Sequence, residues 1–212
     1  MKNYGKFVSG LLVAWFLFAL FASALQLFKN DSNRFGVAVA IAALAPILLF
    51  FLWFTASRSF RQFTLSLDPA ILASLQAWRI VGFTFVLLEA HRVLPAVFAL
   101  PAGYGDMAIG ATAAFAAWKL ATPANRNAFV IWQVLGIADL VTAVTLGTTA
   151  FLLSPHDASM VPLTLLPLSI IPTFLVPLFL IFHVICIAQA KSWEVASRRT
   201  RPIVGPAQPA AL

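Results

Sequence analysis

Residues 35–56, which read FGVAVAIAALAPILLFFLWFTA, decide the class of this protein. The stretch contains no Asp, Glu, Lys or Arg. A helix needs roughly 20 predominantly apolar residues to cross the hydrocarbon core of a bilayer, and this stretch is long enough. It therefore predicts a membrane-spanning helix.

Similar apolar stretches recur on both sides of it. The predicted spanning helices are six, over residues 7–28, 35–56, 71–90, 104–120, 127–153 and 162–189. The 212-residue chain is 61% hydrophobic and only 10% charged, whereas a soluble domain is about half apolar and about a quarter charged. So few charges cannot cover a soluble surface. The sequence predicts an all-α, polytopic transmembrane helical bundle, with one transmembrane domain over residues 1–190.

The positions of Lys and Arg predict the orientation of this bundle. If both termini are cytoplasmic, ten basic residues lie inside and three, Lys29, Arg34 and Arg92, lie outside. Cytoplasmic loops carry an excess of Lys and Arg, so we expect an N-in, C-in arrangement. Residues 191–212 then form a basic, disordered cytoplasmic tail. The alternative is cleavage of a signal peptide at Ala22-Ser23-Ala24, although the apolar stretch continues to Phe28.

Composition also limits the partners. The net charge of +7 lies in short clusters between apolar runs, which indicates membrane orientation and no nucleic-acid binding. A single cysteine, Cys186, allows neither an intrachain disulfide nor a Cys-rich metal site. We find no catalytic signature such as Gly-x-Ser-x-Gly or His-Glu-x-x-His. We expect no metal and no cofactor; the partners are the lipid bilayer and either a second copy or another membrane protein.

Two charged residues fall inside the predicted spans. Arg79 lies about 12 Å and Asp139 about 18 Å from the cytoplasmic ends of their helices, at about 1.5 Å per residue. A charge at such a depth needs a partner, a cavity or a short path to the interface. We predict an ion pair between Arg79 and Asp139, supported by hydrogen bonds from Gln133 and Thr142. The pair either belongs to a site or only fixes two helices together.

A second group of polar residues is expected near the outer face. Glu89, His91, Arg92 and Asp106 form either a plain rim or the vestibule of a site. Glu89 and Arg92 neutralise each other if their helix continues that far. Asp106, Gly110 and Ala114 follow one another at intervals of four residues, which puts a carboxylate on the same helix face as small residues and predicts a helix-packing face.

His183 is expected near the cytoplasmic end of the last helix. A haem would need a second axial ligand at the same depth, and His91 and His156 belong to the opposite side of the membrane. A hydrogen-bonded structural histidine is the favoured interpretation, and a proton relay is the alternative.

Prolines predict interrupted helices. The last span carries Pro167, Pro172 and Pro177, and residues 94–106 form an apolar stretch with Pro and Gly that we interpret as re-entrant. Interrupted segments at corresponding positions of two halves are typical of the binding sites of inverted-repeat transporters. A shared Gly-x-small-Asp pattern at Gly103 to Asp106 and Gly136 to Asp139 is interpreted as coincidence, because adjacent antiparallel helices carry it.

Several of these segments carry a resemblance: Trp78-Arg79, residues 98–106, residues 136–140, residues 172–177 and His183. In them the chain resembles a group of uncharacterised bacterial multi-pass inner-membrane proteins. The resemblance covers about half of the chain and implies a bacterial origin and a cell-membrane location. It implies no activity.

The sequence leaves two functional hypotheses. The first is a small-solute or ion transporter or channel with its path between the third and sixth helices. Its path residues are Arg79, Asp106, Asp139, Gln133, Thr142 and His183, with Glu89, His91 and Arg92 as the outer vestibule. The second is a noncatalytic membrane subunit, a scaffold or sensor partner, in which these charges only hold helices together. An intramembrane enzyme or haem protein is the remaining alternative.

Overall fold

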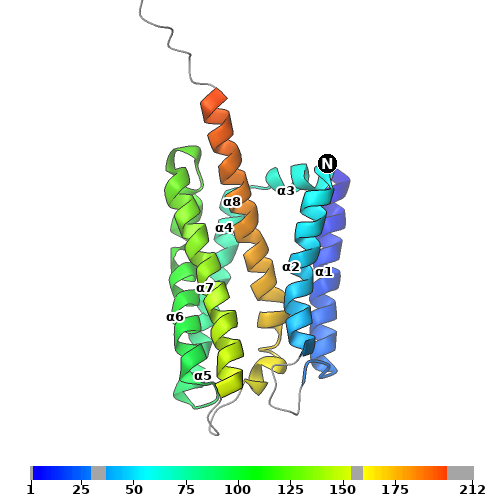
Figure 1. Cartoon of the computed structure of the whole chain (residues 1–212), viewed down its shortest axis with the longest axis vertical. Coiled ribbons are helices and arrows are strands. Elements are labelled where there is room, and N and C mark those ends of the chain that lie inside the picture. Colours follow the sequence, from blue (N-terminus) through cyan, green and yellow to red (C-terminus); the bar gives the residue numbers. More distant parts are fainter. Residues whose placement is uncertain (1, 30–36, 154–159, 200–212) are drawn as a thin grey trace, which may run out of the picture.

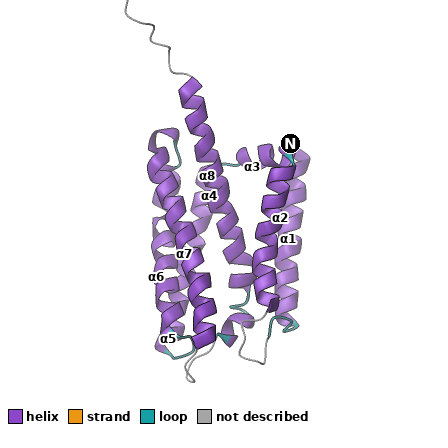
Figure 2. Cartoon of the chain, in the orientation of Figure 1, coloured by secondary structure: helices purple, strands orange, loops and turns teal. Residues whose placement is uncertain are grey.

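A computed structural model describes residues 2–29, 37–153 and 160–199. The described part of the chain is an all-α bundle without strands (Figures 1 and 2). Its first elements are α1 (Lys2–Ala24), α2 (Val37–Ala56), α3 (Arg58–Leu65), α4 (Pro69–Leu75), the 3₁₀ helix η1 (Gln76–Gly82) and α5 (Phe83–Ala90). They are followed by α6 (Ala96–Phe115), the π-helix η2 (Ala116–Leu120), η3 (Pro123–Asn125), α7 (Arg126–Leu153), η4 (Val161–Thr164), the π-helix η5 (Ile171–Leu175) and α8 (Val176–Arg199).

Five helical stretches are long and apolar enough to cross a membrane: Tyr4–Ala24, Val37–Ala56, Pro69–Ala90, Pro123–Ala150 and Ile171–Trp193. They overlap five of the six predicted spans. The sixth predicted span corresponds to α6, which runs beside α7 in the bundle (Figure 1). It is not among these five stretches, and Gly103, Tyr104, Gly105 and Asp106 follow one another near its middle.

The re-entrant interpretation of residues 94–106 is wrong. Pro95 precedes α6, which then runs without a break from Ala96 to Phe115 and carries Pro101 inside it. A proline is tolerated within a membrane helix because neighbouring groups satisfy the freed carbonyl. The helix therefore begins eight residues before the predicted start at 104.

The predicted helix over residues 162–189 also differs from the structure. Residues 161–164 form a short 3₁₀ turn, and Leu166–Pro167 is a cis peptide bond. Continuous helix begins only with the π-helix η5, which leads directly into α8. Prolines lack the N–H that a helix needs, so Pro167 lies outside the helix and Pro172 in the π-helical turn. At the other end, α8 continues to Arg199, so the predicted tail does not begin at 191. Residues 200–212 lie outside the described residues.

The amphipathic helix α3 lies between the predicted spans 35–56 and 71–90 and belongs to neither. Ser57 caps it by accepting a hydrogen bond from the Phe60 N–H at 3.3 Å. Phe60 and Thr64 are buried, whereas Arg58, Ser59 and Gln62 are exposed. The helix lies across the end of the bundle that also carries the N-terminus and the turn between α6 and α7 (Figure 1).

The buried apolar side chains form two main layers along α4 to α8. One layer includes Leu72, Ala113, Phe129 and Cys186. The other includes Phe85, Phe98, Ala102 and Ala150. Along its own stretch of helix, each of Arg79, Asp106 and Asp139 lies in sequence between a residue of one layer and a residue of the other. A polar layer therefore separates two apolar layers.

Candidate functional site

Arg79 occupies the centre of the bundle, with only 1% of its side chain exposed. It projects from η1, a 3₁₀ segment of seven residues between α4 and α5. Runs of 3₁₀ helix longer than three or four residues are uncommon and often mark a hinge or a strained stretch. The segment packs directly on α6 at Gly110, where a Cβ would collide with the Ile80 backbone nitrogen. Position 110 requires a glycine because the backbone of α6 is in direct contact with the backbone of η1 there.

Four groups surround the guanidinium. Its Nε donates to Asp106 Oδ1 at 2.7 Å, and its Nη2 donates to Asp139 Oδ2. Its Nη1 lies 3.4 Å from the carbonyl oxygen of Gly136 and 3.2 Å from His183 Nε2. Hydrogen bonds with ionised groups are about twice as strong as neutral ones. The arrangement joins η1, α6, α7 and α8 at one point.

His183 is held in one tautomer by its neighbours. Arginine only donates hydrogen bonds, so His183 Nε2 accepts from Arg79. The proton therefore lies on Nδ1, which donates to Gln133 Oε1. His183 is fully buried, and a second proton would place a cation against the guanidinium. The imidazole is therefore neutral, and the hydrogen bonding expected for His183 is confirmed at both ring nitrogens.

Each partner of Arg79 packs over a glycine of the next element. His183 of α8 lies over Gly136 of α7, Asp139 of α7 over Gly105 of α6, and Asp106 of α6 over Gly82 of η1. A Cβ at any of these three glycines would collide with the side chain above it. The glycines therefore let the four elements approach closely enough for all partners to reach one guanidinium.

The charges of this cluster do not balance. Arg79 carries one positive charge, His183 is neutral, and Asp106 and Asp139 are two carboxyl groups at the same guanidinium. With both carboxyl groups ionised, the net charge is −1. The side chains of Asp106 and Asp139 are 16% and 14% exposed, so each keeps an accessible edge that Arg79 does not occupy. One proton or one monovalent cation would make the cluster neutral.

The predicted ion pair between Arg79 and Asp139 is confirmed. Gln133 belongs to the cluster, but through His183 and not through the ion pair. Thr142 is exposed, and no hydrogen bond joins it to the cluster in the described part of the chain. Its predicted supporting contact is wrong, because the Thr142 side chain is exposed and does not reach the cluster.

The placement of Asp106 with the outer residues is wrong, because it binds Arg79. The reason is the start of α6 at Ala96, which puts Asp106 about 15 Å into the helix at about 1.5 Å per residue. His183 likewise lies in the first third of α8 (Val176–Arg199), far from the end where the sequence placed it. The shared Gly-x-small-Asp pattern could have indicated the position of Asp106, because the two aspartates of the pattern, Asp106 and Asp139, bind the same guanidinium.

Glu89, His91 and Arg92 lie apart from the cluster, where α5 ends. The helix stops at Ala90, and Arg92 adopts a left-handed backbone with φ 58°. The helix thus does not continue as far as neutralisation of Glu89 by Arg92 requires, and among the residues that the structure describes no ion pair joins the two. His91 is exposed and its Nδ1 lies 2.8 Å from the Leu87 carbonyl oxygen.

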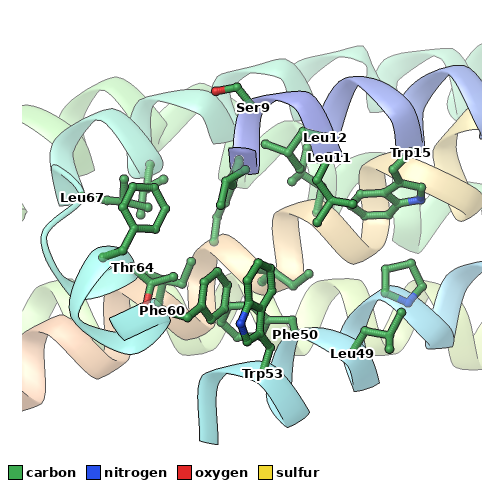
Figure 3. Close-up of a pocket in the computed structure, with 18 of the residues that line it drawn as sticks. Ser9, Leu11, Leu12, Trp15, Leu49, Phe50, Trp53, Phe60, Thr64 and Leu67 are labelled. Atoms are coloured by element: carbon green, nitrogen blue, oxygen red, sulfur yellow. The ribbon is translucent and has the colours of Figure 1, made fainter. Parts of the chain in front are cut away.

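A cavity of about 620 Å³ lies elsewhere, between α1, α2, α3 and α8 (Figure 3). Leu12, Trp15, Leu49, Phe50, Trp53 and Phe60 are among its lining residues. Its walls are almost entirely apolar, and neither Arg79 nor its three side-chain partners line it. In the described segments, no three His, Cys, Asp or Glu side chains are placed to hold a metal ion.

A family model described as a domain of unknown function (DUF8737) matches residues 34–190. The chain belongs to this family. The matched DUF8737 region contains Arg79, Asp106, Asp139 and His183, and it begins after α1. No curated protein and no solved structure matches the chain.

Proposed function

We propose that this protein is a small-solute or ion transporter whose cluster at Arg79 binds the coupling proton or monovalent cation. The observation that carries the proposal is the presence of two carboxyl groups at one guanidinium beside a neutral histidine. A simple helix-locking pair would need one carboxylate. The second adds a negative charge inside a bundle of membrane helices, where an uncompensated charge costs several kcal/mol.

The carboxyl edges that face away from Arg79 are where the cation would bind. Arg79 is fully enclosed, whereas Asp106 and Asp139 each keep a small exposed area. Binding a proton or cation there removes the excess charge and weakens the hold of one carboxylate on Arg79. The 3₁₀ segment that carries Arg79 and the π-helical turn before α8 are irregular elements of the kind found at hinges and functional sites. A change in charge could thus be transmitted to helix packing.

The topology that we propose has six spans, with α6 as the fourth, and both termini in the cytoplasm. Lys6, Arg58, Arg61, Lys119, Arg126 and Lys191 belong to the elements at one end of the bundle. Arg92 belongs to the turn at the opposite end (Figure 1). The excess of basic residues at the first end supports its placement in the cytoplasm. We further propose one transmembrane domain in a bacterial inner membrane, acting alone or as a homo-oligomer.

Flux into proteoliposomes tests the transport proposal. Purified protein is reconstituted, and movement of protons, Na⁺, K⁺ and a panel of small metabolites is followed. We expect flux of at least one solute to depend on a proton or cation gradient, and Asp106→Asn or Asp139→Asn to abolish that dependence. Glu89→Gln removes a carboxylate outside the cluster and should leave the flux unchanged. The proposal is contradicted if no solute is transported, or if the flux of every transported solute is the same with and without a proton or cation gradient.

A noncatalytic membrane subunit, a scaffold or sensor partner, is the second candidate. The specific observation in its favour is that each nitrogen of the guanidinium already has a partner within the protein. The large apolar cavity also does not reach the cluster. This candidate predicts no flux of any solute and a stable complex with another membrane protein that survives solubilisation in mild detergent.

A further inference from the structure

The apolar cavity lies between α1 and α2, which also contact each other through ring pairs such as Phe7 and Trp53. The first helix contacts α3 and η5, and the second contacts α3, η5 and α8. The space between them is lined by side chains such as Leu12 and Trp15 from one side and Leu49 and Trp53 from the other (Figure 3). Ligand pockets of small molecules span about 300–1,000 Å³, so a cavity of about 620 Å³ lies within that range.

One end of the cavity is closed by aromatic side chains beneath α3. The Trp53 and Phe60 rings stack at 3.8 Å between centroids, and Tyr4 stacks on Phe63 at 5.8 Å. Trp and Tyr are enriched where the hydrocarbon meets the headgroups. This end of the cavity therefore lies at the level of the interface, and α3 is an amphipathic interfacial helix above it.

Basic residues adjoin the same end. Arg58 and Arg61 lie on α3 beside the cavity-lining Phe60, and Lys6 lies on α1 beside the cavity-lining Gly5. The described acidic residue closest in sequence, Asp68, caps α4 by accepting from the Ala70 N–H at 2.8 Å. A cationic rim therefore stands next to an apolar space, as an amphiphile with a negative headgroup requires.

We propose that this cavity binds one acyl chain of an anionic phospholipid, whose phosphate headgroup lies with Arg58, Arg61 and Lys6. The apolar lining accommodates the chain, and the basic residues select the headgroup by charge. The bound chain fills the space that α1 and α2 leave open and completes the packing of α1 against the rest of the bundle. The site is distinct from the cluster at Arg79, which contributes none of its lining.

Tryptophan quenching by brominated lipids tests this site in the full chain. Trp78→Phe, Trp118→Phe and Trp193→Phe leave Trp15 and Trp53 at the cavity and Trp132 buried at 7% exposure. The protein is reconstituted in phosphatidylcholine with a minor fraction of acyl-brominated phosphatidylglycerol, or with the same fraction of acyl-brominated phosphatidylcholine. We expect several-fold stronger quenching by the anionic lipid.

Two pairs of variants separate the headgroup from the acyl chain. Arg58→Gln, Arg61→Gln and Lys6→Gln together should bring quenching by the two lipids to parity, whereas Lys119→Gln, a charge loss at the same end of the bundle, should keep the preference. Val8→Phe with Leu12→Phe should reduce quenching by both lipids, and Val13→Phe, on an exposed position of α1, should not. Equal quenching of the parent by both lipids, no quenching at all, or a preference that survives loss of all three basic residues would overturn the proposal.

Discussion

Asp106 on α6 and Asp139 on α7 bind the same guanidinium, one at Nε of Arg79 and the other at Nη2. The two carboxylates therefore repel each other unless Arg79 or a proton lies between them. This relationship makes the three residues unequal. Arg79 offsets only one of the two negative charges, so removing Arg79 leaves two unpaired carboxylates, whereas removing one aspartate leaves a balanced pair.

This inequality predicts an order of stabilities. Arg79→Gln leaves two uncompensated carboxylates and should lower the free energy of unfolding by roughly 3–5 kcal/mol, as the loss of one partner of a buried ion pair does. Asp106→Asn or Asp139→Asn leaves a balanced pair and should cost less than about 1.5 kcal/mol, in the range of a neutral hydrogen bond. Denaturant unfolding in detergent micelles measures the order. An asparagine variant as unstable as Arg79→Gln would contradict it.

Direct contact between Arg79 and Asp139 predicts coupling in a double-mutant cycle. Arg79→Ala strands Asp139, and Asp139→Ala weakens the hold on Arg79, so the double variant should recover about 0.5–3 kcal/mol relative to the sum of the two. The same cycle with Arg79 and Thr142, which is exposed, should be additive. Additivity in both cycles would show that the ion pair contributes no stability of its own.

The glycine contacts predict a third result. Gly105→Ala and Gly136→Ala place a methyl group against Asp139 and His183, so each should destabilise the protein by about 1–3 kcal/mol, as overpacking does. Gly10→Ala is the control, because a Cβ there meets nothing within 4 Å. Thermal unfolding of the three purified variants gives the comparison. If Gly105→Ala behaves like Gly10→Ala, α6 and α7 are not held as closely as described.

The proposed topology predicts which positions react from outside the cell. In a Cys186→Ala background, His91→Cys should be labelled in intact cells by a membrane-impermeant maleimide, because His91 is exposed in the turn after α5. Ser59→Cys, exposed on α3, should be labelled only after permeabilisation. Labelling of position 59 in intact cells would reverse the orientation.

The length of apolar stretches was sufficient to predict most of the spans, because a helix in lipid must satisfy its own backbone and cannot be interrupted freely. Depth along the helix was sufficient to pair Arg79 with Asp139. The prediction of the spans and the prediction of the ion pair both depend on a single quantity, the position of a residue along the membrane normal. The amphipathic α3 was missed because its eight residues are too few to give a clear period.

The errors arose where a helix boundary was misjudged. Starting α6 at residue 104 instead of Ala96 moved Asp106 from the centre of the bundle to its rim. Ending the last helix at 189 instead of Arg199 moved His183 toward the surface. Proline and glycine near 95–105 suggested a break, yet the glycines serve close packing around Asp139 and Val86. Such packing depends on neighbouring helices, which a single sequence does not reveal.

The order of the cluster residues along the chain bears on how the protein is made. Arg79 enters the membrane first, 27 residues before Asp106 and 60 before Asp139. An unpaired arginine at mid-membrane costs about 2.5–3.5 kcal/mol on insertion scales. The nascent α4 to α5 segment therefore stays poorly settled in lipid until α6 and α7 have followed, and His183 arrives last with α8. In a bilayer, a nascent chain that ends before α6 would therefore hold Arg79 without either of its carboxyl partners.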